Sequence, residues 1–148
     1  MDKKYPSSTK VVVIGGGVIG CSVAYHLTKF GWKDVVLLER DQLTSGTTWH
    51  AAGLVSQLGP SASVTKIRKY TLDLYKNLEK EVDHSAGLRL NGALSIAQTD
   101  SRWQELKRQA TTAQLYDVDL RMLNKEEIKK KYPMMSTCLL YTSPSPRD

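Results

Sequence analysis

The sequence is poor in cysteine and contains no long apolar run. Two cysteines among 148 residues, with no CxxC pair, indicate neither a disulfide framework nor a zinc site, so we expect no metal and a reducing compartment. Every apolar run is shorter than the ~18 residues that a membrane span needs. The first ten residues lack the apolar core of a signal peptide. We therefore expect a protein of the cytoplasm, or of the mitochondrial matrix if the source is eukaryotic.

Basic residues outnumber acidic ones, which gives a formal net charge of +6. Such a charge can indicate an anionic partner. Here, however, Glu126 and Glu127 stand four residues before Lys130 and Lys131, an arrangement typical of a solvated helix face. No nucleic-acid-binding motif accompanies the charge, so we expect no nucleic-acid partner.

The last eleven residues, CLLYTSPSPRD, do not continue the pattern that precedes them. They resemble the translated sequence of a transposase adapter used in DNA library preparation. We therefore expect residues 138–148 to be an adapter-derived artefact, with a short Ser/Pro-rich tail as the alternative. Residues 1–9 then form an N-terminal tail, and residues 10–137 form the N-terminal part of a larger domain.

A glycine-rich turn follows a short β-branched run near the start of the chain. The run, residues 11–14, predicts a buried parallel strand. Gly15, Gly17 and Gly20 then supply the spacing G-x-G-x-x-G. The first glycine allows a tight turn, the second lets a pyrophosphate approach the backbone, and the third lets a helix pack on the strand. The alternative is a turn that packs a helix without binding a ligand.

The helix predicted over residues 18–30 begins at this turn, so its first amides and its positive dipole end face the phosphates. The second strand, residues 35–38, ends in Glu39, at the place where a carboxylate hydrogen-bonds the adenosine ribose. The negative charge of Glu39 disfavours a ribose that carries a 2′-phosphate. Arg40 by itself would favour such a phosphate. The unit predicts a bound dinucleotide, whose further contacts are Val18, Ile19, Glu39 and Arg40.

The next segment, RDQLTSGTTWHAAGLV, distinguishes FAD from NAD as the cofactor. It resembles the segment after the second strand in FAD-dependent oxidoreductases of the D-amino-acid oxidase superfamily, and its details resemble the dimethylglycine and sarcosine dehydrogenase group. The resemblance implies that the Ser-Gly segment lies beside the FAD pyrophosphate and that His50 is joined covalently to the flavin. The FAD contacts that it implies here are Ser45, Gly46, Thr47, His50, Ala52, Gly53 and Leu54.

The chemistry of His50 is compatible with such a linkage. A neutral imidazole is a competent nucleophile near pH 7, and the small residues that follow His50 would let a flat ring approach the backbone. The linkage would make the flavin a better electron acceptor. The alternative is a structural histidine that is hydrogen-bonded in a packed loop.

Downstream, the sequence predicts helices and a short sheet. Apolar residues recur at three- and four-residue steps over residues 61–84, which predicts an amphipathic helix. Partial alternation over residues 87–99 predicts two short strands or one bulged strand. Capping-box patterns at Ser101 and at Asn124 predict two further helices, and Pro133 ends the second. The first of these two helices would bury Trp103, Leu106, Ala110 and Ala113.

Together these elements predict an α/β fold, with a Rossmann-like FAD-binding βαβ unit followed by the start of a substrate-side α+β region. The parallel sheet would hold only its first strands, so its edge and apolar faces would lack partners. We therefore expect an incomplete domain.

The resemblance also implies an activity for the full-length protein. It would oxidise N-methylated glycine-type amines such as sarcosine or dimethylglycine by hydride transfer to FAD, with oxygen or an electron-transfer flavoprotein as the electron acceptor. Tetrahydrofolate would bind in a C-terminal part. The catalytic residues would lie beyond Thr137, so the present chain alone is not expected to catalyse.

Three alternatives stay open. One is another amino-acid oxidase of the same superfamily. A second is a non-catalytic regulatory subunit of the kind that serves pyruvate dehydrogenase phosphatase, against which the presence of His50 counts. The third is a nicotinamide dehydrogenase, which the Ser45-Gly46 segment disfavours.

Overall fold

The computed structural model describes residues 6–138 and divides the chain into two units, one that ends at Leu54 and one that begins at Val55. Of the segment expected to be adapter-derived, Cys138 is described as an exposed free cysteine, and residues 139–148 lie outside the described residues. None of the helices in the described part is long and apolar enough to cross a membrane.

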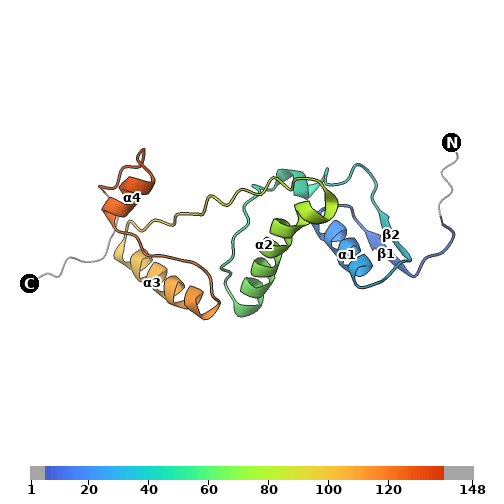
Figure 1. The fold of residues 1–148 in the computed structure, drawn as a ribbon, viewed down its shortest axis with the longest axis horizontal. Coiled ribbons are helices and arrows are strands. Elements are labelled where there is room, and N and C mark those ends of the chain that lie inside the picture. The colour runs from blue at the N-terminus through green and yellow to red at the C-terminus, as the bar shows by residue number, and fades with distance from the viewer. Residues whose placement is uncertain (1–5, 139–148) are drawn as a thin grey trace, which may run out of the picture. The chain divides into compact units, whose positions relative to one another are not determined.

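The first unit contains the predicted sequence of strand, helix and strand. β1 (Val11–Ile14) and β2 (Val35–Leu38) pair in parallel, with Val11 opposite Val35. α1 (Val18–Lys29) joins the two strands and packs on them (Figure 1). The predicted α/β class and the predicted bounds of both strands are confirmed.

Gly31 ends α1, because a glycine just after the last helical turn allows the left-handed conformation of a helix C-terminus. Its φ of +89° lies in the left-handed region that favours glycine. The Gly31 amide donates to the Thr28 carbonyl at 2.9 Å, and the Trp32 amide donates to the Leu27 carbonyl at 3.0 Å. These two hydrogen bonds form a Schellman motif, which satisfies carbonyls that a helix end leaves without partners. The motif reverses the chain toward β2.

The two faces of this sheet differ in burial. Successive side chains of a strand point to opposite faces. Val13 is half-buried, whereas Val12, Ile14 and Leu38 are 48%, 85% and 48% exposed. The buried strand that the sequence predicts is therefore half-exposed, because α1 is the one α-helix described in this unit. A β-branched run does not reveal how many layers cover it.

Up to residue 138, the second unit contains three helices, α2 (Ala62–Val82), α3 (Asp100–Leu115) and α4 (Lys125–Lys131). The predicted capping box of α4 is confirmed. The Glu127 amide donates to the Asn124 side chain at 2.8 Å, and the Asn124 amide donates to the Glu127 carboxylate at 2.7 Å. Two orphan amides of the helix start are thereby satisfied.

The prediction that Ser101 caps α3 is wrong, because the helix begins earlier. Thr99, and not Ser101, caps the helix, because its Oγ1 accepts a hydrogen bond from the Arg102 amide at 3.3 Å. Ser101 lies inside the first turn, with its hydroxyl 3.2 Å from that of Thr99. Serine and threonine are both good caps, so the backbone decides between them, and Thr99 has the extended conformation (φ −137°, ψ 156°) that a cap requires.

The apolar face predicted for α3 is buried. Trp103 and Leu106 form a cluster with Ala97, which lies just before the helix. Ala113 has no exposed surface and Ala110 is half-buried. The prediction that these positions form core is confirmed.

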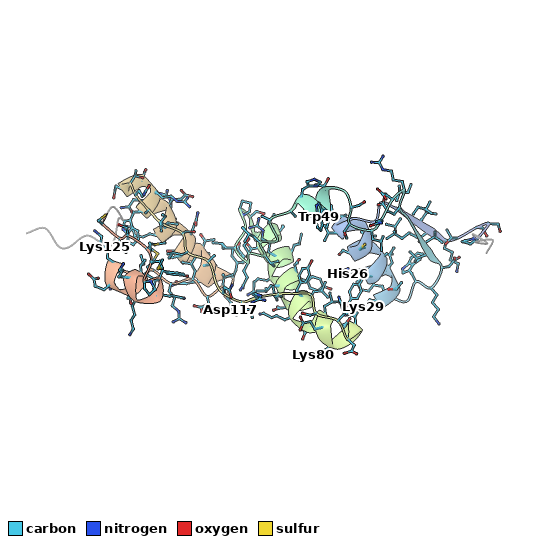
Figure 2. All side chains as sticks on the ribbon, turned by 90° about the horizontal axis from the view of Figure 1, so that it is seen from above. His26, Lys29, Trp49, Lys80, Asp117 and Lys125 are labelled. Carbon is cyan, nitrogen blue, oxygen red and sulfur yellow. The ribbon has the colours of Figure 1, made fainter. Side chains whose placement is uncertain are left out.

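Lys69 of α2 forms hydrogen bonds with the C-terminal end of α3. Its ammonium donates to the carbonyl of Tyr116 and, at 3.1 Å, to that of Asp117, the residue labelled in Figure 2. A cation at a helix C-terminus satisfies the last carbonyls and complements the helix dipole.

The segment 87–98 contains no strand, although its alternation predicts one or two. A strand requires a hydrogen-bonded neighbour, and in the described part of the chain β1 and β2 pair only with each other. Alternation shows that a segment could line a sheet, but it does not supply the partner strand.

Candidate functional site

The glycine turn lies at the carboxyl ends of β1 and β2, where parallel sheets bind ligands. Gly15 leaves β1 with a φ of +104°, and its amide donates to the Leu38 carbonyl at 2.8 Å. A Cβ atom placed on Gly20 would overlap the Gly15 carbonyl oxygen. The third glycine of the motif therefore allows α1 to start directly against the turn, in the role that the spacing predicts.

The start of α1 presents backbone amides at this turn. Gly17 is the N-cap, and the first helical amides have no acceptor within the helix. The amides of Ile19 and Gly20 can therefore donate to an anion. The Val18 amide already donates to the Thr48 Oγ1 atom at 2.9 Å. The sequence does not predict this contact, since Thr48 lies 30 residues further along the chain.

Glu39 follows β2 and turns its carboxylate toward the glycine turn. One oxygen accepts a hydrogen bond from the Gly16 amide at 2.6 Å, and the other accepts one from the Asp41 amide at 3.1 Å. The Gly16 hydrogen bond is the main reason why the pKa of Glu39 lies below its usual value, and the Asp41 bond and the nearby Arg40 charge act in the same direction. The carboxylate is thus ionised at neutral pH and can accept hydrogen bonds from ribose hydroxyls.

The segment after β2 folds back onto the glycine turn. The Thr44 amide donates to the Gly16 carbonyl at 2.9 Å, and a Cβ atom on Gly16 would meet the Leu43 side chain at 2.5 Å. Thr44 itself has a φ of +66°, which is uncommon for a β-branched residue and indicates local strain. The sequence motif contains no signal for these contacts, although the middle glycine of GGG is the residue that permits them.

The short 3-10 helix η1 (Thr47–His50) carries the candidate flavin-attachment residue. His50 is exposed, and its Nδ1 atom lies 3.1 Å from the Gly46 carbonyl oxygen. A carbonyl oxygen only accepts, so Nδ1 donates, and Nε2 keeps its lone pair in the neutral ring. Trp49 is 78% exposed and projects from η1 (Figure 2).

The other expected contacts of this segment are accessible. The Ser45 hydroxyl donates to the Gln42 carbonyl at 2.8 Å. A Cβ atom added to Gly46 would have no neighbour within 4 Å. Gly53 has a φ of +69°. Ala52, Gly53 and Leu54 are exposed, with 90% of the Leu54 side chain accessible.

These groups fit a dinucleotide. The glycines of the turn have no side chains that would keep a pyrophosphate from the backbone, the start of α1 supplies amide donors, and Glu39 supplies an ionised acceptor. The structure brings together all three parts that the sequence predicts, and it adds Gly16, Thr44 and Thr48.

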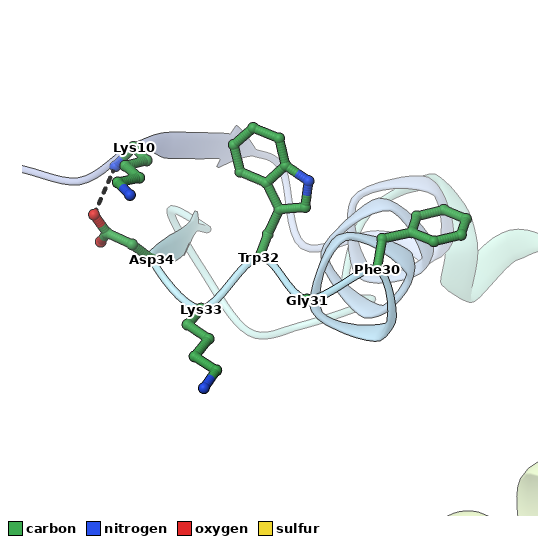
Figure 3. A pocket seen from close by; sticks show the side chains of 6 residues that line it. All are labelled: Lys10, Phe30, Gly31, Trp32, Lys33 and Asp34. Carbon is green, nitrogen blue, oxygen red and sulfur yellow. Dashed lines mark hydrogen bonds between the residues drawn. The ribbon is translucent and has the colours of Figure 1, made fainter.

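A separate hollow lies at the opposite, amino ends of the strands. It has a volume of about 370 Å³ and is lined by Lys10 and residues 30–34, of which Phe30 is 79% exposed and Trp32 47% (Figure 3). Asp34 binds the Lys10 amide at 3.0 Å across its edge. Because it is remote from the carboxyl ends of the strands, this hollow is not the dinucleotide site.

Comparison with known proteins supports the same interpretation. The family model described as "FAD dependent oxidoreductase" (DAO) matches residues 10–144. Mouse mitochondrial sarcosine dehydrogenase is 43% identical over 137 residues, which cover 92% of this chain and 15% of that protein. Human mitochondrial dimethylglycine dehydrogenase is 37% identical over 135 residues, which cover 91% of this chain and 16% of that protein. The chain thus spans about one sixth of the length of these relatives.

A solved structure matches as well. The glycine oxidase of Bacillus cereus ATCC 14579 superposes with a TM-score of 0.71 at 26% identity, over 90% of this chain and 38% of that one. The match supports a mixed α/β fold that contains the parallel β1-α1-β2 unit.

Proposed function

Because the chain belongs to the DAO family of FAD-dependent oxidoreductases, we propose that the full-length protein oxidises N-methylated glycine-type amines, such as sarcosine or dimethylglycine. The chain forms the N-terminal part of its FAD site. The observation that carries this proposal is the exposed His50 on η1, the segment whose Thr48 binds the first amide of α1, in a chain that is 43% and 37% identical to relatives named for these two substrates.

We assign the parts of the cofactor to residues of this chain. The turn from Gly15 to Gly20, with the amides of Ile19 and Gly20, holds the pyrophosphate. The Glu39 carboxylate accepts hydrogen bonds from the ribose hydroxyls, and the hydrogen bond from the Gly16 amide already holds it in place. Bound FAD supplies the two-electron acceptor for oxidation of the carbon next to the amine nitrogen.

We further propose that His50 is the point of covalent attachment and that Nε2 is the bonding atom. The hydrogen bond from Nδ1 to the Gly46 carbonyl orients the ring and keeps the proton on Nδ1. Nε2 is therefore left as the nucleophile. The exposed residues Ala52 and Gly53 leave space beside the ring for a flat partner.

The remaining parts of the reaction belong to residues outside this chain. We place the substrate-binding and catalytic residues, and any tetrahydrofolate site, after Thr137. The electrons pass to oxygen or to an electron-transfer flavoprotein. We place the protein in the cytoplasm, or in the mitochondrial matrix of a eukaryote, as the free thiol of Cys21 and the mitochondrial relatives suggest.

The test compares wild type with His50→Ala in the full-length protein. Acid-precipitated protein is run on a denaturing gel and its flavin fluorescence is recorded. We expect fluorescence in the wild type and none in His50→Ala, which should still bind some FAD without a covalent bond. The matched control is His26→Ala, since His26 also pairs Nδ1 with a helix carbonyl, that of Ser22 at 2.7 Å, but lies on α1.

Turnover tests the substrate assignment. Sarcosine and dimethylglycine should reduce the flavin faster than glycine does. Faster reduction by glycine would favour another amino-acid oxidase, and no reduction by any of the three amines would favour a regulatory subunit.

In the gel experiment, flavin fluorescence that survives in His50→Ala would contradict His50 as the attachment site.

A further inference from the structure

We infer that Thr48 is a positioning residue, which holds the His50 segment against the start of α1 so that flavin attachment depends on the Thr48 hydroxyl; this inference rests on the proposed function of His50. The contact that carries it is the 2.9 Å hydrogen bond from the Val18 amide to the Thr48 Oγ1 atom.

The Val18 amide needs an acceptor from outside the helix. Val18 is the first residue of α1, where the amide has no intrahelical partner. An N-cap side chain accepts from the second or third amide of a helix and not from the first, and the N-cap here, Gly17, has no side chain at all. Thr48 thus supplies the acceptor that the glycine motif lacks, from a segment 30 residues away.

η1 is held together by local hydrogen bonds. The Trp49 amide donates to the Gly46 carbonyl at 3.1 Å, the Ala51 amide donates to the Thr48 carbonyl at 3.2 Å, and His50 Nδ1 contacts the same Gly46 carbonyl. The residues from Gly46 to Ala51 therefore move as one piece. The position of His50 depends on what holds this piece.

Two contacts with the glycine turn hold it. The Thr44 amide binds the Gly16 carbonyl before η1, and Thr48 binds the Val18 amide within it. The Thr48 contact lies only two residues from His50. Without the Thr48 hydrogen bond, η1 keeps only the Thr44 hydrogen bond to the turn, which lies further from His50 along the chain.

Thr48 approaches Gly17 so closely that a side chain at position 17 would crowd it. A Cβ atom on Gly17 would lie 3.0 Å from the Thr48 Oγ1 atom, so Thr48 would have to shift by a few tenths of an ångström. Gly17 therefore has a second role beside the admission of a pyrophosphate, because it also admits the Thr48 hydroxyl.

The test uses the full-length protein made without flavin, in wild type, Thr48→Val, Thr48→Ser and Thr28→Val forms. Valine keeps the shape of threonine but cannot accept a hydrogen bond, and serine keeps the hydroxyl. Thr28→Val is the matched control, since the Thr28 hydroxyl donates to the Tyr25 carbonyl within α1 itself. Two measurements are made: hydrogen exchange of the Val18 amide before FAD is added, and the rate at which acid-stable flavin forms afterwards.

In Thr48→Val we expect the hydrogen of the Val18 amide to exchange roughly tenfold faster than in the wild type, because one hydrogen bond is lost. For the same reason, acid-stable flavin should form roughly tenfold more slowly. It should still bind FAD reversibly. Thr48→Ser and Thr28→Val should resemble the wild type.

An unchanged Val18 exchange rate in Thr48→Val, or attachment at the wild-type rate, would overturn the inference. A wild type that forms no acid-stable flavin would instead overturn the proposed attachment at His50. In that case the exchange measurement still decides whether Thr48 holds η1, so the two failures are distinguishable.

Discussion

The Gly16 amide donates a 2.6 Å hydrogen bond to the Glu39 carboxylate, and this contact joins the phosphate turn after β1 to the acid that follows β2. The two residues lie 23 positions apart, in the two halves of the βαβ unit. The ribose and pyrophosphate parts of the proposed FAD site are therefore held in one fixed relation before any ligand binds.

Glu39→Gln should weaken FAD binding and change how stability depends on pH. The folded-state pKa of Glu39 lies below its ordinary value of 4.5, so its ionised form stabilises the fold fully above about pH 4.5, and this stabilisation is lost as the pH falls through the lowered pKa. The stability difference between wild type and Glu39→Gln should therefore shrink below that pH. Unfolding measured from pH 7 to pH 3 checks this.

In the same variant the dissociation constant for FAD should rise roughly tenfold, since a charged acceptor is lost. Glu105→Gln is the control, because the pKa of Glu105 is also lowered, by its hydrogen bond with Arg102, but Glu105 belongs to α3. Equal effects of the two variants on FAD binding would argue against the ribose role of Glu39.

Gly20→Ala should destabilise the first unit by about 1–3 kcal/mol or more, because the added methyl group overlaps the Gly15 carbonyl and separates α1 from β1. Gly46→Ala is the matched control for stability, since Gly46 has an ordinary φ of −83° and nothing within 4 Å of the added atom. Thermal unfolding of both FAD-free variants tests this contrast. Similar losses would show that the close packing at Gly20 is not required.

Thr99→Ala should cost about 1 kcal/mol of stability, the usual cost of a lost helix cap. Ser101→Ala should be nearly neutral, because Ser101 lies within α3 and does not cap it. Denaturant titrations of the two variants separate the alternatives. A larger loss for Ser101→Ala would reinstate the capping box that the sequence suggests.

Ile14→Lys should reduce self-association of the 148-residue chain. Ile14 is 85% exposed and shares an apolar sheet face with Val12 and Leu38, and exposed apolar faces beside open strand edges promote aggregation. Light scattering over a concentration series measures the effect. Val13→Lys is the comparison, since Val13 is half-buried on the other face and should lose stability instead.

Local signals made much of this fold predictable. The bounds of β1 and β2, the end of α1 at Gly31 and the capping box at Asn124 all depend on residues within a few positions of one another. The buried face of α3 follows from its spacing in the same way. Helix and turn preferences are set by such short-range sterics and hydrogen bonds, so a sequence is sufficient to recognise them.

The sequence by itself thus determined the βαβ unit, its glycine turn and the identity of the residues around the proposed FAD site. Only the tertiary structure decided that Gly16 holds Glu39, that Val18 donates to Thr48, that one sheet face stays partly exposed and that residues 87–98 form no strand. The physical reason is that a contact across 23 or 30 residues depends on the path of the chain, and a strand or a sheet face depends on a partner. Neither condition is contained in the local pattern.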